Sequence, residues 1–270
     1  MAEATQLVDH FSLGFISGRV KAFRPPDESF DPGGDWTLNY GVYTFASGRS
    51  GASSGAQVGR MQFARKAVDD ATALLTISYD KLWPEVTQHV EAEIRCGTDR
   101  LSTPGAWHYS ARVADYENSK ITKRATANDG RIEICDDHST RRLALNGHFT
   151  INWALWDAVM RLPREAVELI TFTMLDHFDQ IKRRQSLAFR KTVVVPLGEQ
   201  RRQEETVREL PKGRITETRW ATHGGRNVTL HAFEHLGEGI VPWVYWLDDH
   251  GRLLFVISGI EVYILESLNG

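Results

Sequence analysis

The C-terminal stretch of residues 240–265, IVPWVYWLDDHGRLLFVISGIEVYIL, constrains the fold of this chain more than any other segment. Residues 243–246 and 252–257 are rich in aromatic and β-branched side chains, and turn-forming residues separate them at 248–251. A third run of the same kind follows Gly259, at residues 260–265. Three such runs in succession predict an apolar antiparallel meander, which the rest of the chain must cover.

Alternating hydrophobic and polar residues upstream predict further strands. The clearest pattern spans residues 86–96, where Val90, Ala92, Ile94 and Cys96 share one parity and charged or polar residues take the other. Such alternation is typical of an antiparallel strand with one solvated face. Similar patterns predict strands at 36–45, 73–79, 107–113, 120–127, 131–135, 180–190, 191–195, 214–220 and 227–233, with Asn128-Asp129-Gly130 as a hairpin turn.

Residues 153–162 form the one clear helical pattern. Trp153, Trp156, Val159 and Met160 recur at three- and four-residue spacing, and Pro163 ends the pattern. Residues 164–174 fit a helix or a strand equally well, and no βαβ alternation suggests a parallel sheet. We expect an irregular N-terminal segment, residues 1–35, and a single antiparallel β domain, residues 36–270. Its predicted fold class is mostly β, with one large curved sheet or open barrel wrapped around the short helix.

The buried faces of these strands supply a predicted core. Each chosen residue lies in an alternating or wholly apolar strand, on the parity that carries the larger side chains. The residues predicted to be buried are Val90, Ile94, Leu230, Val244, Phe255 and Ile264.

The overall composition narrows the class of partner. The chain has 270 residues, 41% hydrophobic and 25% charged, which is typical of a globular protein. Its formal net charge of −3 gives no electrostatic basis for binding nucleic acid or an anionic membrane. No apolar run approaches the roughly 20 residues that cross a bilayer, so no transmembrane segment is expected. The N-terminus lacks a signal-peptide pattern, which predicts a cytoplasmic location for the chain as given, or a periplasmic or secreted one if a leader was removed.

Common catalytic and cofactor motifs are absent. The sequence has no GxSxG, HExxH or CxxC, and its glycine-rich residues 48–59 lack phosphate-binding spacing, so we predict no cofactor and no metal. Residues 48–59 are predicted to be a hairpin connection, or alternatively a flap over a site. Cys96 and Cys135 are expected to be reduced thiols, with a single disulfide as the alternative in an exported protein.

Two histidine-containing segments are candidates for a metal site or a general base. His231 and His235 flank Phe233 in a predicted strand, where four residues span ~13 Å, too far to share a metal ion. They are therefore predicted to be surface or edge histidines. Asp176 and His177 could act as a general base or metal ligand near the helix, although a solvated turn explains the same residues.

Four blocks of sequence resemble a known family: NWALWDAVMRLP, TFTMLDHFD, PWVYWLDDHGRLLFV and IEVYIL. Their order is similar to that in an uncharacterised family of bacterial exported β proteins. These are domains of unknown function, similar in outline to the LolA/LolB lipoprotein carriers. The resemblance covers roughly residues 36–265 and implies a curved sheet around a helix, with an apolar cleft. It implies no catalytic residues, and the missing leader departs from the exported pattern.

The predicted cleft lies where the helix meets the C-terminal meander. Two tryptophans are more aromatic surface than a ~10-residue helix needs for packing, although a plain core role is the alternative. Trp243 and Tyr245 share one face of their strand while Trp246 takes the other, so only one set is expected to face the core. The predicted ligand-binding residues are His148, Trp153, Trp156, Asp176, His177, Trp243 and Tyr245.

The leading functional hypothesis is a binding protein for a lipid-like or other amphiphilic ligand. The alternative is a carbohydrate-active enzyme, a hydrolase or lyase in which tryptophans stack on sugar rings and a Tyr, His or Asp transfers protons. Whether the protein is an enzyme, and its oligomeric state, are left open, as is a structural role through an exposed sheet edge. A cleft of Leu, Val and Trp alone favours the carrier, whereas polar groups clustered among aromatics favour the enzyme. Candidate acids or bases are Tyr79, His108, Tyr109 and Tyr116.

Overall fold

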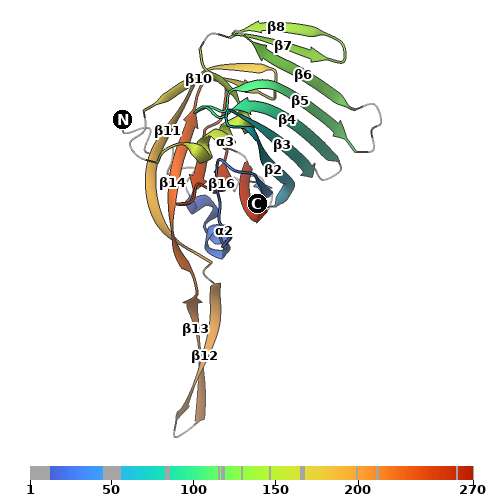
Figure 1. The fold of residues 1–270 in the computed structure, drawn as a ribbon. Coiled ribbons are helices and arrows are strands. Elements are labelled where there is room, and N and C mark those ends of the chain that lie inside the picture. The colour runs from blue at the N-terminus through green and yellow to red at the C-terminus, as the bar shows by residue number, and fades with distance from the viewer. Residues whose placement is uncertain are drawn as a thin grey trace.

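A large curved β-sheet curls around one short helix in the computed structural model (Figure 1). The structure describes residues 13–44, 56–82, 86–114, 116, 119–128, 130–145, 147–164, 168–198, 200–210, 213–259 and 261–269; for 200–210 and 213–223 it describes the backbone. Most of the predicted connection at 48–59 lies outside these residues. The mostly β fold class, with its open curved sheet around a helix, is confirmed.

The described elements comprise seventeen strands and three helical segments. The helical segments are η1 (Leu13–Ile16), α2 (Ser17–Ala22) and α3 (Asn152–Arg161). The strands are β1 (Trp36–Thr44), β2 (Gln57–Asp69), β3 (Thr72–Leu82), β4 (Thr87–Gly97), β5 (Pro104–Val113), β6 (Ile121–Asn128), β7 (Arg131–Asp136), β8 (Thr140–Ala144), β9 (Phe149–Ile151), β10 (Ile170–Asp176), β11 (Gln180–Leu197), β12 (Gln200–Leu210), β13 (Gly213–His223), β14 (Arg226–Leu236), β15 (Trp243–Leu247), β16 (Leu253–Ile257) and β17 (Glu261–Asn269).

Fifteen of these strands form one sheet, in the order β8-β7-β6-β5-β4-β3-β2-β1-β17-β16-β15-β14-β11-β10-β9. All its described pairs are antiparallel except β9 with β10. Side-chain contacts, rather than backbone hydrogen bonds between strands, connect the two ends of this sheet. Asp179, in the turn after β10, lies 2.9 Å from Lys123 on β6 and 2.6 Å from Arg141 on β8. The turn also accepts a hydrogen bond from Trp107 of β5 at the Phe178 carbonyl, so these contacts hold the curl of the sheet while the sheet itself stays open.

A long ribbon leaves this body. The β11–β14 pair ends at Leu197 and Arg226, and the two-stranded sheet β12–β13 continues it outward (Figure 1). Gly198 and Gly224 at the junction have φ values of +78° and +74°, which only glycine adopts without strain. The sequence had predicted the second strand of this extension but not the first.

The predicted core and helix are confirmed. Val90, Ile94, Leu230, Val244, Phe255 and Ile264 are all buried. In β4, burial follows the predicted parity through to Cys96. The predicted helix is α3, residues 170–174 of the ambiguous segment belong to strand β10, and Asn128 pairs with Arg131 where the hairpin turn between β6 and β7 was predicted.

Two expectations about the N-terminal segment and the meander are wrong. Residues 1–35 were expected to be irregular, but 13–22 are helical, and Leu13, Ile16 and Val20 join the core. Their neighbour Phe23 packs against Phe255 with ring centroids 4.9 Å apart. This segment covers the second face of the meander. Consequently Trp246, paired with Phe255, is 1% exposed, and both faces of β15 are buried rather than one.

A buried ionic network fixes α3 inside the sheet. Asp157 of α3 is 0% exposed, and its Oδ1 lies 3.0 Å from Nε of Arg65 on β2. Its Oδ2 accepts hydrogen bonds from Ser102 at 2.6 Å and from Nη2 of Arg161 at 2.9 Å. Arg65 also donates to the carbonyls of Gly33 and Gly34. The network therefore joins the helix, strand β2, the β4–β5 connection and the N-terminal segment.

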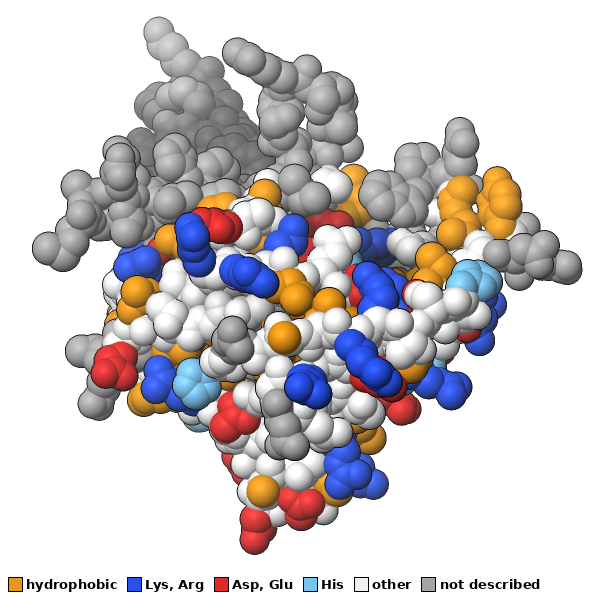
Figure 2. Space-filling model, turned by 90° about the horizontal axis from the view of Figure 1, so that it is seen from above, with side chains coloured by type: hydrophobic (Ala, Val, Ile, Leu, Met, Phe, Trp, Pro, Cys, Tyr) orange, Lys and Arg blue, Asp and Glu red, His pale blue; other side chains and the backbone are white. Residues whose placement is uncertain are grey.

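The described surface is mixed in charge. On the face seen in Figure 2, basic and acidic side chains are interspersed, and hydrophobic side chains form small separate groups. No helix in the described part of the chain is long and apolar enough to cross a membrane. Cys96 and Cys135 are free thiols on β4 and β7, with β5 and β6 between their strands.

Candidate functional site

A cavity of about 350 Å³ lies between the first turn of α3 and the C-terminal meander. One wall comes from β3, β4 and β5, and the opposite wall from β15, β17 and residues 239–241. The turn that follows β10 lies at its edge. The cavity exists because α3 starts directly after β9 and projects into the hollow of the curled sheet (Figure 1).

Aromatic rings make up much of the lining, and Tyr263 is at their centre. Its ring centroid lies 5.1 Å from that of Trp156, 6.2 Å from that of Trp243 and 6.2 Å from that of Tyr79. The interplanar angles of these pairs are 85°, 25° and 64°, so the rings present both faces and edges. A second aromatic group comprises Phe178 with Trp153 and Tyr109.

Polar groups are placed among these rings. The Tyr263 hydroxyl donates to Glu261 Oε2 at 2.8 Å, and Lys81 Nζ lies 3.9 Å from Glu261 Oε1. The Tyr79 side chain is 2% exposed, and although its hydroxyl is near Tyr263, it makes no hydrogen bond of ordinary geometry. Asn152 Oδ1, at the start of α3, is likewise buried without a partner. Unpaired buried polar atoms are costly, and here both border a cavity that a ligand could fill.

Burial fixes the protonation of several lining residues. It raises the pKa of Tyr79, Tyr245 and Tyr263 far above the usual tyrosine value, so these hydroxyls remain protonated. It lowers the pKa of His235 to about 3, so this imidazole is neutral. His235 Nε2 lies 3.0 Å from Gln185 Oε1, a contact that places the imidazole proton on Nε2.

His235 corrects an expectation from the sequence. It was predicted to be a surface or edge histidine, but it is 1% exposed. Residues 232–235 of β14 are all buried, so both faces of the strand are covered there, and its place between β11 and β15 leaves it no free edge. His231 on the same strand is bound instead to Asp249, 2.9 Å away, and to Thr192.

The turn at the cavity edge has an unusual backbone. His177 and Phe178 have φ values of +48° and +68°, which non-glycine residues rarely adopt. Asp179 holds this turn through its contacts with Lys123 and Arg141. Although burial acts in the opposite direction, these two cations lower the pKa of Asp179. The fixed turn directs Phe178 inward, where it is 1% exposed, and leaves His177 on the surface.

Six of the seven predicted ligand-binding residues border this one cavity: Trp153, Trp156, Asp176, His177, Trp243 and Tyr245. His148 does not, because it is exposed ahead of β9, and its carbonyl accepts a hydrogen bond from the Thr173 backbone. Of the candidate acids and bases, Tyr79 and Tyr109 line the cavity. His108 points to the other face of β5, and Tyr116 is 63% exposed. That these residues bind a ligand stays a prediction.

Sequence reasoning missed Lys81, Phe178, Glu261 and Tyr263 as lining residues. Glu261 and Tyr263 carried a usable signal, since they share one parity of an otherwise apolar strand and a lone acid there is unusual. Lys81 and Phe178 carried none, because their place depends on how distant strands meet.

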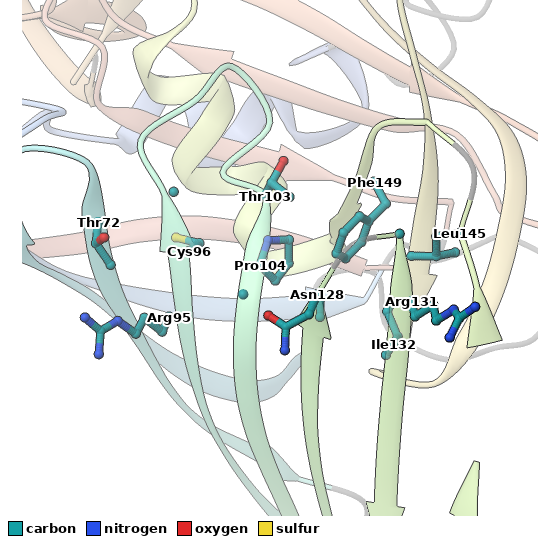
Figure 3. Close-up of a pocket in the computed structure, with 14 residues that line it drawn as sticks. Thr72, Arg95, Cys96, Thr103, Pro104, Asn128, Arg131, Ile132, Leu145 and Phe149 are labelled. Atoms are coloured by element: carbon teal, nitrogen blue, oxygen red, sulfur yellow. The ribbon is translucent and has the colours of Figure 1, made fainter. Parts of the chain in front are cut away.

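A second cavity, of about 390 Å³, lies across the ends of β3 to β7 (Figure 3). Its arginines, Arg95 and Arg131, point in opposite directions, so no charged groups converge in it. Burial, with the Asp157 carboxylate adding to it, raises the pKa of the Cys96 thiol to about 12, which keeps that sulfur protonated and unreactive. None of the predicted residues lines this cavity, and the α3 cavity is the better candidate.

The unpaired Tyr79 hydroxyl generates a stability prediction. Tyr79→Phe should change the free energy of unfolding by less than about 0.5 kcal/mol, because no good hydrogen bond is lost. Tyr40 is the matched control, since it is equally buried but donates to the Leu253 carbonyl at 2.8 Å. Tyr40→Phe should cost about 1–2 kcal/mol in a denaturant titration. Equal losses in the two variants would show that the Tyr79 hydroxyl is paired.

The neutral His235 generates a pH prediction. The unfolded chain binds a proton at this histidine near pH 6.5, whereas the folded protein does so only near pH 3. Acid therefore favours unfolding, and lowering the pH from 7 to 5 should remove about 2 kcal/mol through this residue alone. His235→Gln should flatten the dependence by that amount, while His138→Gln, at an exposed position, should leave it unchanged. Identical pH profiles for wild type and His235→Gln would refute the buried neutral state.

Comparison with known proteins identifies a similar fold but does not assign the chain to a family. No protein-family model matches the chain, and no curated protein matches it. Among solved structures, it is similar to a β-barrel-like protein of the domain of unknown function DUF1849 from Brucella abortus. The TM-score is 0.56 at 12% identity, over 87% of this chain and 97% of that one. At that identity the likeness establishes a shared barrel-like fold, consistent with an uncharacterised β-domain family.

Proposed function

We propose that this protein binds a small amphiphilic or lipid-like molecule in the cavity between α3 and the C-terminal meander. One observation carries the proposal: an aromatic-walled cavity of about 350 Å³ bordered by two buried polar atoms, Asn152 Oδ1, which has no partner, and the Tyr79 hydroxyl, which makes no hydrogen bond of ordinary geometry. That volume is at the lower end of the range for small-molecule pockets. A ligand with an apolar body and a polar head would cover the rings and pair the hydroxyl.

The distribution of side chains supports an amphiphile. Val90, Met174, Ile240 and Val241 add aliphatic surface between the aromatic groups. The charged groups Lys81 and Glu261 are together and half-buried at one part of the lining. An aromatic and aliphatic lining that also holds one charged pair matches a molecule with an apolar body and a polar end.

The alternative, a carbohydrate-active enzyme, is favoured by the mixture of carboxylates with aromatic rings. Rings of this kind also stack on sugars, and Asp176 and Glu261 both line the cavity. General acid–base catalysis, however, works best with groups whose pKa lies near the working pH. Burial moves the pKa of the lining tyrosines upward and that of His235 down to about 3, away from that range. Binding therefore stays the leading proposal, and because Asp176 and Glu261 lie among the rings, turnover is the outcome that the experiment below must test.

The similarity in outline to the LolA/LolB carriers is part of this proposal, and the location stays as predicted: cytoplasmic for the chain as given, or periplasmic or secreted if a leader was removed. The mixed charge of the face in Figure 2 supports a small-molecule partner over nucleic acid.

Two half-buried tryptophans provide the test. Trp153→Ala and Trp243→Ala each remove a ring from the lining at a position where the side chain is only partly buried. Each should weaken binding of an octyl-chain amphiphile, followed by calorimetry, about tenfold or more, because an aromatic contact of this size contributes on the order of 1–3 kcal/mol. Tyr116→Ala, an exposed aromatic outside the cavity, is the matched control and should bind as wild type does.

The alternative function has a separate readout in the same experiment. Oligosaccharides are incubated with the wild-type protein, and the products are separated by chromatography. Cleavage that disappears in Tyr263→Phe would identify the enzyme and sink the binding proposal. Unchanged amphiphile binding in both tryptophan variants, with the fold intact, would exclude this cavity.

A further inference from the structure

We infer that the cavity selects a ligand whose polar head is an organic cation, such as a trimethylammonium group. The inference rests on the proposed function and names the head group that the same cavity takes. It follows from the sign of the lining charges, from the arrangement of the rings and from the position of one lysine.

The ionisable groups of the lining carry more negative than positive charge. Asp176 and Glu261 are carboxylates, Lys81 is the one cation among the described lining residues apart from the histidines, and buried His235 is neutral. His177 is largely exposed, with its Nε2 3.9 Å from Asp176 Oδ1. Lys81 offsets Glu261. Asp176 has no closer charged partner among the described residues, so its carboxylate remains to attract a cationic head.

The aromatic rings are arranged as a cation would require. Tyr79, Trp156, Trp243 and Tyr263 all line the cavity, and each of the first three has its ring centroid within 6.2 Å of that of Tyr263. The faces of tryptophan and tyrosine attract ammonium groups within about 6 Å of the ring centroid. Groups of such rings are the usual recognition surface for quaternary ammonium ligands.

The position of Lys81 shows that this wall of the cavity accommodates an ammonium group. Its ammonium lies 5.2 Å from the centroid of the Tyr79 ring and 3.9 Å from Glu261 Oε1. An alkylammonium group of the protein itself therefore occupies the combination of ring face and carboxylate that the ligand head would use. A ligand cation would share these contacts or replace Lys81, whose side chain is 27% exposed and can turn outward.

The start of α3 is the one feature of the lining that would favour an anion. No side chain caps this helix, and its first turn contains no acidic residue. Asp176 provides the missing negative charge from the neighbouring strand. Leu175 pairs with Ile151, and Asp176 and Asn152 follow these partners directly, which sets the carboxylate beside the helix start. A helix start carries roughly half a positive charge, so it offsets only part of the Asp176 carboxylate and the net charge of the lining stays negative.

Three amphiphiles with the same octyl chain test the inference: octyltrimethylammonium, octyl glucoside and octanoate. Calorimetry with the full chain at low ionic strength should give octyltrimethylammonium at least about tenfold tighter binding than octanoate, with octyl glucoside between them. Equal binding of all three would leave the proposed function standing and overturn the cationic head. No binding of any of them would overturn both.

Two charge-removing variants locate the effect. Glu261→Gln and Asp176→Asn keep the shape of the side chains, and each should reduce the preference for the cation over octyl glucoside about threefold to tenfold. Glu133→Gln, at an exposed strand position paired with Arg142, is the control and should keep the wild-type preference. Thermal unfolding verifies that each variant is folded. A preference that survives in both variants would place the selectivity elsewhere and refute the assignment.

Discussion

The burial of Asp157 is the interaction on which the rest of this structure depends. A ten-residue helix is too short to be stable alone in water, so α3 persists only through what the sheet supplies. The Asp157 carboxylate forms an ion pair with Arg65 of β2. It also accepts hydrogen bonds from Ser102 in the β4–β5 connection and from Arg161 in its own helix. A buried carboxylate needs partners of this kind, and so its position fixes where the helix, the two strands and the Gly33–Gly34 carbonyls meet.

The cavity follows from this anchoring. The network holds the second half of α3, and the uncapped first half is left to project between the two walls of the curled sheet. Trp153 and Trp156 then face the meander strands, while Leu155 and Val159 complete the core. Two of the buried polar atoms without a hydrogen-bond partner of ordinary geometry, the Tyr79 hydroxyl and Asn152 Oδ1, border the cavity at this unanchored end, whereas Arg65 Nε and Asp157 Oδ1 at the anchored end form an ion pair. The network that stabilises α3 and the proposed binding cavity thus lie at opposite ends of one helix, so that substitutions can alter each of them separately.

Much of the sheet could be predicted because strands such as β4 show alternation that only one half-buried face explains. Strand β2 was missed, since its inward parity of Met61 and Phe63 continues with Arg65, a charge whose burial only a distant aspartate accounts for. His235 was misplaced for a similar reason: a single strand does not reveal that both of its faces are covered. In the site, aromatic content singled out Trp153, Trp156, Trp243 and Tyr245, but their placement in one cleft rested on the family resemblance, and the position of Lys81 depends on tertiary packing.

The free energy of unfolding of Asp157→Asn tests this account most directly. The substitution keeps the shape of the side chain and leaves Arg65, with a 2% exposed side chain, facing a neutral amide. We expect a loss of about 3 kcal/mol or more relative to wild type, because removing one partner strands a buried charge. Glu133→Gln, in the exposed pair with Arg142, should cost less than about 1 kcal/mol. A similarly small loss for Asp157→Asn would contradict the view that this network holds the helix and, with it, the cavity.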